Sequence, residues 1–394
     1  MPVAKHILPI IVFSQFCCTS LWFAGNAVMA DLLLNYNLDA SALGHLTSAV
    51  QLGFISGTLI FAIFGIADRF PPSRVFFICA LVGAMFNFSI ISEENTLNSL
   101  LMLRFLTGFS LAGIYPVGMK IATDYYQKGL GTSLGFLVGA LVLGTAFPHL
   151  LKDITSFGEL HWKAVLITTS VLSVLGGLLI FLFIPNGPYR TPKLNRDFTA
   201  AFKVFKNSDF KAAAFGYFGH MWELYAFWAF VPVALQIYQE VHPGTDFNIP
   251  LLSFLIIGSG GLACIIGGYI SEKFGTRNTA ATALFLSGCC CLLSPLLLLQ
   301  NSPLVAVAFL IFWGIMVVAD SPLFSSLVAQ NAIPESRGTA LTIVNSIGFG
   351  ITILSIQLLN IFTEVFDPIY LFLILAAGPA FGLWAMFIKN SSEV

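Results

Sequence analysis

Four ionisable side chains lie within strongly apolar stretches of this sequence, where a charge is costly to bury. They are Arg104, His220, Glu223 and Asp320. A charged side chain at the centre of a membrane helix costs at least about 2.5 kcal/mol on insertion scales, so such residues usually mark a functional site. These four positions are therefore the first candidates for chemistry.

Glu223 and His220 lie three residues apart in the stretch GHMWELYAFW (219–228). At about 100° per residue, their side chains are about 60° apart on a helix. A carboxyl group beside an imidazole can take up and release a proton, which is the chemistry of a proton-coupling site. The alternative is a hydrogen bond that only holds helices together.

Arg104 is the one cation among the four. Gly108 and Tyr115 lie on the same helix face, within about 40° of Arg104, which favours the wall of a solute cavity. Lys120 and Asp124 lie on the opposite face, four residues apart. We expect these two to neutralise each other as a structural pair.

Asp320 lies two residues before Pro322. Proline removes a backbone hydrogen bond and can bend a helix, so an acid at this place is a candidate for substrate binding or proton coupling. Trp22 and Asn26, in the stretch LWFAGN (21–26), are uncharged candidates for lining the same cavity. Trp22 could instead be an anchor at the membrane interface.

The composition indicates what kind of elements position these residues. Of the 394 residues, 57% are hydrophobic and 9% are charged, against about 25% charged in soluble domains. A membrane helix needs about 20 apolar residues, and the sequence predicts an all-α membrane protein with twelve transmembrane helices. The expected helices are 7–30, 41–66, 73–92, 97–124, 129–151, 161–184, 211–238, 249–272, 277–299, 303–330, 337–362 and 367–388.

The basic residues indicate the orientation. Most of the 18 lysines and arginines fall in segments on one side of the expected helices, whereas only Lys152 and Lys163 fall in the loops of the other side. The positive-inside rule then puts both termini in the cytoplasm. We expect a multi-pass protein of the bacterial inner membrane, with the lipid bilayer around it and no nucleic acid as a partner.

Three short segments recur in order, between 204 and 207 residues apart. They are ADRFPPSR (67–74) with SEKFGTR (271–277), YP (115–116) with SP (321–322), and GTSL (131–134) with GTAL (338–341). Parallel six-helix repeats are a transporter architecture. The sequence therefore predicts two six-helix pseudo-repeats as domains, 1–184 and 211–394.

The segment 185–210 between the two domains is predicted to be a cytoplasmic linker. Phe198, Phe202 and Phe205 recur there at helical spacing, with lysines between them. This pattern favours an interfacial helix on the inner leaflet, and an ordinary solvated linker is the alternative.

The segments GYISEKFGTR (268–277) and FGIADRFPPSR (64–74) resemble the loop motif Gly-x-x-x-Asp-Arg-x-Gly-Arg-Arg of the major facilitator superfamily. In that family the motif forms a cytoplasmic gate. Its acid caps a facing helix N-terminus, and its basic residues hold the two bundles together. The alternative is that the basic residues only set the topology. The matching positions are Asp68, Arg69, Arg74, Glu272, Lys273 and Arg277.

Two further motifs carry the resemblance. Arg104 and Gly108 match the arginine–glycine pair of the family's fourth helix, and GFLVGALVLG (135–144) is similar to the antiporter motif of its fifth helix, with Ala140 in place of the proline. The resemblance implies the major facilitator fold, in which helices 1, 4, 7 and 10 line a central cavity. Arg104, Glu223 and Asp320 belong to three of these helices.

The function expected from these residues is secondary active transport of a small polar organic solute by alternating access, coupled to protons, with a preference for antiport and export. One alternative is an uncoupled facilitator or an importer of a small organic anion, and another is a lipid-handling membrane protein. We expect a monomer that is not an enzyme and has no cofactor or metal. The chain shows neither a phosphate-binding glycine loop nor a clustered nucleophile–base pair.

Overall fold

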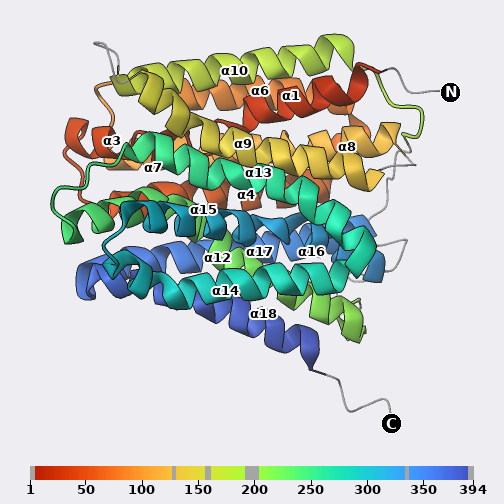
Figure 1. Ribbon diagram of the computed structural model, residues 1–394. Helices are drawn as coiled ribbons and strands as arrows, with labels where there is room; N and C mark the ends of the chain where they lie inside the picture. The colour runs from red at the N-terminus through yellow and green to blue at the C-terminus, as the bar shows by residue number, and fades with distance from the viewer. Residues whose placement is uncertain (1–4, 127–129, 156–160, 191–203, 333–336, 389–394) are drawn as a thin grey trace. The chain divides into compact units, whose positions relative to one another are not determined.

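The computed structural model describes residues 5–126, 130–155, 161–190, 204–332 and 337–388 of the chain (Figure 1). Its elements are α-helices and short 3₁₀ segments. The chain divides into two units, which we call unit 1 and unit 2. Unit 1 consists of Met1–Leu194 and Phe247–Gly261, and unit 2 consists of Asn195–Asp246 and Leu262–Val394.

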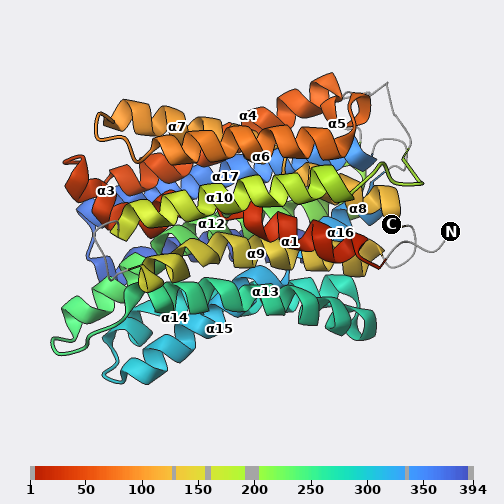
Figure 2. The same ribbon diagram turned by 90° about the horizontal axis from the view of Figure 1, so that it is seen from above.

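Unit 1 contains ten helices and the first part of an eleventh within the described residues. α1, α6 and α10 lie side by side in both views, and α4 packs along α7 (Figures 1 and 2). The helices are α1 (Ile7–Thr19), α2 (Ala24–Ala27), α3 (Met29–Asn35), α4 (Ala42–Phe64), α5 (Ile66–Arg69), α6 (Pro72–Ser89), α7 (Leu97–Leu111), α8 (Tyr115–Tyr125), α9 (Leu130–Ile154), α10 (His161–Phe183) and the first half of α13 (Ile249–Phe274).

Unit 2 is built around α12, which packs against α14, α16, α17 and α18. α12 contains 34 residues. The elements of this unit are η1 (Val204–Lys206), α12 (Ser208–Val241), the second half of α13, α14 (Thr276–Leu299), α15 (Pro303–Ala319), α16 (Ser321–Asn331), α17 (Arg337–Val365), η3 (Pro368–Ala376) and α18 (Ala377–Phe387).

Ten helices in the described part of the chain are long and apolar enough to cross a membrane. The first expected helix, 7–30, is broken into α1, α2 and α3, of which α1 has 13 residues. The seventh expected helix, which corresponds to α12, is also not among these ten, and it contains polar residues such as His220 and Glu223. The described residues therefore contain ten candidate membrane spans. The total of twelve spans and the cytoplasmic position of the termini stay predictions.

The expected interfacial helix lies mostly outside the described residues, because Phe198 and Phe202 belong to the segment 191–203. The part that the structure describes is the 3₁₀ turn η1, followed by Asn207. The Asn207 side chain accepts hydrogen bonds from the backbone N–H groups of Asp209 and Phe210 and so begins α12.

Two spans are broken at matching places. The spans Leu97–Tyr125 and Pro303–Asn331 both have 29 residues, and the second begins and ends 206 residues after the first. Each resumes with a proline at its second position, Pro116 in α8 and Pro322 in α16. Proline is well tolerated at a helix start because it lacks only a donor that would be unpaired there anyway. The break and the proline that follows it therefore recur in the two spans at the positions of the YP and SP dipeptides.

Glycine allows an unusually close approach of α4 and α7 in unit 1. A Cβ atom added at Gly108 would lie 1.9 Å from the carbonyl oxygen of Val50, and one added at Gly53 would lie 1.9 Å from that of Phe105. Any side chain would separate the two backbones, so these glycines set the position of α7 and of Arg104 on it.

Candidate functional site

His220 and Asp320 form a buried contact in unit 2. His220 Nδ1 lies 2.8 Å from Asp320 Oδ1, and the two side chains are 1% and 0% exposed. Asp320 is the last residue before α16 and follows α15 directly, so its position depends on the break that Pro322 permits. The contact therefore joins the middle of α12 to the broken helix.

The surroundings of this pair are mainly aromatic. The His220 ring lies between Tyr217 and Phe324, with centroid distances of 6.0 and 6.1 Å. Within the described part of the chain, His220 Nε2 and Asp320 Oδ2 have no hydrogen-bond partner. Burying polar atoms without partners is costly, so the pair retains the capacity to bind a proton or a polar group.

Glu223 occupies a different environment in the same unit. Its Oε1 atom accepts hydrogen bonds from Trp313 Nε1 at 2.6 Å and from Cys291 Sγ at 3.3 Å. Its Oε2 atom accepts one from Ser287 Oγ at 2.9 Å. The side chain is fully buried between α12, α14 and α15. Three donors therefore converge on one carboxyl group.

The expected pairing of Glu223 with His220 is not what the structure shows. The spacing of three residues does place both side chains near one face of α12. However, His220 contacts Asp320, whereas Glu223 contacts α14 and α15. A helix wheel gives the direction of a side chain and not the helix that it meets. Sequence reasoning missed Ser287, Cys291 and Trp313, although the i, i+4 spacing of Ser287 and Cys291 on one face of α14 could have indicated the first two.

Arg104 is fully buried in unit 1, and its side chain donates hydrogen bonds to the backbone where the first expected helix is broken. Its guanidinium donates to the backbone carbonyls of Leu21, at 3.1 Å, and Trp22. A Cβ atom added at Gly25 would lie 3.3 Å from Arg104 Nε, which shows how closely the side chain passes α2. No ion pair of the described residues includes Arg104. It is a buried cation held by backbone oxygens.

The uncharged cavity candidates lie next to this break. Trp22 is buried and donates from Nε1 to Gln51 Oε1 at 3.3 Å. Asn26 donates from Nδ2 to Thr47 Oγ1 at 2.7 Å. Both contacts tie the first helix to α4, and the burial of Trp22 disfavours its alternative as an interfacial anchor. The third uncharged candidate, Tyr115, is half-buried at the start of α8.

One gate candidate of unit 1, Asp68, belongs to an ionic cluster. Lys120 Nζ lies 3.3 Å from Asp68 Oδ1 and 3.3 Å from Asp124 Oδ1, which confirms the expected i, i+4 pair. Arg190 donates from Nη2 to the carbonyls of Asp68 and Phe70, at 3.1 and 3.0 Å. The cluster ties α5, α8 and the segment after α10 together.

Arg69 and Arg74 of the same motif are exposed, as are Glu272, Lys273 and Arg277 of its second copy. Lys273 Nζ lies 5.4 Å from the centroid of the Phe274 ring. The structure therefore brings Asp68 into a charge cluster and leaves the other five gate candidates at the surface of their units.

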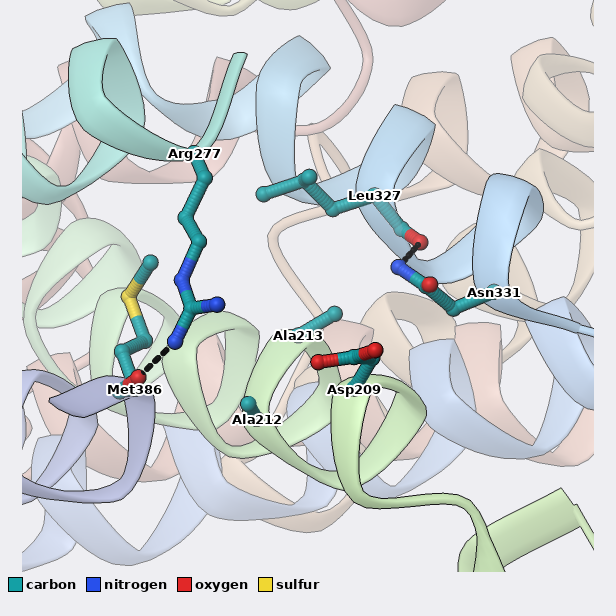
Figure 3. A pocket seen from close by; sticks show the side chains of 7 residues that line it. All are labelled: Asp209, Ala212, Ala213, Arg277, Leu327, Asn331 and Met386. Atoms are coloured by element: carbon teal, nitrogen blue, oxygen red, sulfur yellow. Dashed lines mark hydrogen bonds between the residues drawn. The ribbon is translucent and has the colours of Figure 1, made fainter. Parts of the chain in front are cut away.

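Arg277 points into a pocket of about 230 Å³ in unit 2 (Figure 3). Its guanidinium donates to the carbonyl of Met386 in α18, and Asp209 and Asn331 line the same pocket. Asn331 donates to the carbonyl of Leu327 at 2.9 Å. The pocket thus joins the ends of α12, α14, α16 and α18.

Comparison with known proteins places this geometry in context. A family model described as Major Facilitator Superfamily matches residues 11–356. The bicyclomycin resistance protein homolog of Haemophilus influenzae is 25% identical over 349 residues, which cover 82% of this chain and 80% of that protein. The probable nitrate/nitrite antiporter NarK1 of Thermus thermophilus is 27% identical over 260 residues, which cover 59% of this chain and 55% of that protein.

Solved structures share the fold. A mutant of the nucleoside transporter NupG superposes with a TM-score of 0.73 at 18% identity, covering 98% of this chain and all of that chain. A bacterial homolog of the human lysosomal transporter Spinster, in an inward-facing and unoccupied conformation, gives a TM-score of 0.70 at 17% identity, covering 97% of this chain and 93% of that one.

Proposed function

Because this chain belongs to the Major Facilitator Superfamily, we propose that it moves a small polar organic solute by alternating access in a proton-coupled cycle. The coarser statement is established by the family: the protein is a multi-pass membrane transporter of small solutes and not an enzyme. The proton, the direction and the class of solute are the proposed parts. We further propose twelve membrane helices with cytoplasmic termini, and a monomer in the bacterial inner membrane.

The observation that carries the proposal is the contact between His220 and Asp320. Both groups can change charge, both are buried, and Asp320 lies at the break between α15 and α16. With a proton on the imidazole the pair is an ion pair, and without it the Asp320 charge lacks a counter-ion. A buried charge without its partner is strongly destabilising, so the protonation state biases the conformation of the broken helix.

Arg104 supplies the part of the proposal that concerns the solute. Its guanidinium is charged at physiological pH and is buried without a carboxylate among the described residues. A buried cation favours a solute that carries a negative or strongly polar group. The uncoupled facilitator or importer of a small organic anion is the second candidate, and this same residue supports it.

The direction of transport is proposed from the names of two relatives and from one motif. The relative from Haemophilus influenzae is named for bicyclomycin resistance and the one from Thermus thermophilus is named an antiporter. GFLVGALVLG keeps three glycines of the antiporter motif, at 135, 139 and 144. We therefore propose export by exchange with protons.

The test uses purified protein in liposomes with a pH jump across the membrane. Bicyclomycin, nitrate, a nucleoside and 4-hydroxybenzoate are the first solutes, chosen because proteins similar to this one are named for them. Wild-type flux should rise at least about tenfold when a pH difference of one unit, about 1.4 kcal/mol per proton, is imposed across the membrane. Asp320→Asn should lose that stimulation.

The matched control is Asp246→Asn, which changes an exposed acid of the same unit. It should keep the wild-type response. If flux of a transported solute ignores the gradient and Asp320→Asn transports normally, coupling through this pair is wrong and the facilitator is the better description.

A further inference from the structure

The two carboxyl oxygens of Glu223 have chemically different neighbours. Oε1 faces Trp313 Nε1 at 2.6 Å and Cys291 Sγ at 3.3 Å, whereas Oε2 faces Ser287 Oγ at 2.9 Å. An indole N–H can only donate, so Oε1 must act as an acceptor whatever the charge of the carboxyl group. A proton bound to Glu223 is better placed on Oε2, because Oε1 faces two donors whereas Ser287 Oγ beside Oε2 can accept a hydrogen bond.

Ser287 has a second acceptor within reach. Its hydroxyl oxygen lies 3.1 Å from the carbonyl oxygen of Leu284, one turn earlier on α14. A hydroxyl group carries one donor and two acceptor sites. When Glu223 is ionised, the Ser287 hydroxyl can donate to Oε2. When Oε2 carries a proton, that proton can be donated to Ser287 Oγ, and the hydroxyl hydrogen turns to Leu284.

We propose that Ser287 is a positioning residue that lets Glu223 exist both charged and neutral inside the protein, by exchanging its hydrogen-bond acceptor between Glu223 Oε2 and the carbonyl of Leu284. The step transfers one proton from a hydronium ion of the solvent to Oε2, which neutralises the carboxylate and leaves a water molecule. No other covalent bond forms or breaks, because the Ser287 hydroxyl only rotates.

The exchange matters because neither state leaves Glu223 unpaired. A buried polar group without a partner costs roughly 1–3 kcal/mol, and more if it is charged. Here the charged carboxylate has three donors, and the neutral acid has two donors and an acceptor. Glu223 can therefore gain and lose its proton without that penalty, which a carboxyl group among fixed donors could not do.

The other titratable groups around Glu223 come from three places. Cys290 and Cys291 belong to α14, Asp320 lies between α15 and α16, and His220 lies one turn earlier on α12. The inference deepens the proposed proton coupling and rests on it.

The test measures the protonation of Glu223 separately from transport, so that the exchange of the Ser287 hydrogen bond (the switch) can be judged by itself. Infrared difference spectra of purified protein, with Glu223→Gln subtracted, report the carboxyl bands of Glu223 as pH changes. In Ser287→Ala the charged Glu223 carboxylate loses a hydrogen-bond donor, and the neutral acid loses an acceptor. These two hydrogen bonds differ in strength, so the pH midpoint of the Glu223 titration should move by about one unit. Ser287→Thr keeps the hydroxyl group and should restore the wild-type midpoint.

The matched control is Ser294→Ala. Ser294 lies on the same helix and donates to the carbonyl of Cys291 at 2.8 Å, and its replacement should leave the bands of Glu223 in place. A wild-type midpoint in folded Ser287→Ala overturns the switch. If the midpoint moves and Ser287→Thr restores it while transport ignores the proton gradient, the switch stands and the proposed proton coupling falls.

Discussion

The two broken helices, α7–α8 of unit 1 and α15–α16 of unit 2, share a length and a break but differ in their buried charge. In unit 1 the more deeply buried charge is Arg104, 1% exposed and fixed to the carbonyls of Leu21 and Trp22, whereas Asp124 of the same broken helix is 6% exposed and paired with Lys120. In unit 2 it is Asp320, at the break itself and beside His220. An arginine stays charged in proteins, whereas an acid and a histidine can change charge. The difference teaches that a repeated backbone can carry a permanently charged side chain in one unit and two side chains that can change charge in the other.

The largest expected effect is on Arg104. Arg104→Gln removes the charge and the hydrogen bonds at the break of the first helix, each worth about 1.5–3 kcal/mol, so transport should fall at least about 100-fold. Arg104→Lys keeps the charge but loses the forked pair of guanidinium donors, so it should keep part of the transport rate.

Because Arg104 does not change charge in the cycle, Arg104→Lys should leave the pH profile of transport unchanged in shape, in contrast to Asp320→Asn. The control is Leu310→Met, which alters the buried residue at the corresponding place in α15. Wild-type transport by Arg104→Gln would contradict the assignment, and a changed pH profile in Arg104→Lys would remove the contrast between the two units.

Gly108→Ala tests whether unit 1 depends on the close approach of α4 and α7. The added methyl group would meet the carbonyl of Val50 at 1.9 Å, and overpacking of this kind costs about 1–3 kcal/mol. The thermal unfolding midpoint of the detergent-purified protein should fall. Gly135→Ala is the control, since an added Cβ there meets no atom within 4 Å. Equal midpoints for the two variants would contradict the packing argument.

The smallest expected effects are on the ion pairs of unit 1. Lys120→Met removes the cation beside Asp68 and Asp124, whose side chains are only 9% and 8% exposed, so the free energy of unfolding should fall by roughly 1–3 kcal/mol. The unfolding midpoint should fall with it. Lys163→Met, whose partner Glu93 is 81% exposed, should have no measurable effect. Equal shifts of the midpoint for the two lysine variants would contradict this dependence on burial.

Much of the fold follows from local features of the sequence. Apolar length predicts the ten spans that the structure contains, because hydropathy is a property of each segment alone. Pro322 predicts a bend at the second break, since proline acts on its own helix. The first break, before Pro116, interrupts a helix that the sequence predicts to be continuous over 97–124. The Lys120–Asp124 pair follows from the spacing of one helical turn.

The break in the first helix could not be predicted in the same way. LWFAGN (21–26) contains no proline, and its apolar character predicts one helix over 7–30. The structure holds this break with Arg104, more than 80 residues away in the chain. A distant donor to backbone carbonyls leaves no local signal in the sequence.

The sequence by itself predicted the burial of Arg104, His220, Glu223 and Asp320, because an ionisable residue within an apolar span is visible in the sequence. Only the tertiary structure decided their partners. Glu223 meets Ser287 and Trp313 across 64 and 90 residues of chain, and His220 turns to Asp320 instead. A side chain's direction follows from its own helix, but the group that it meets depends on which helices pack together, and that is a property of the whole unit.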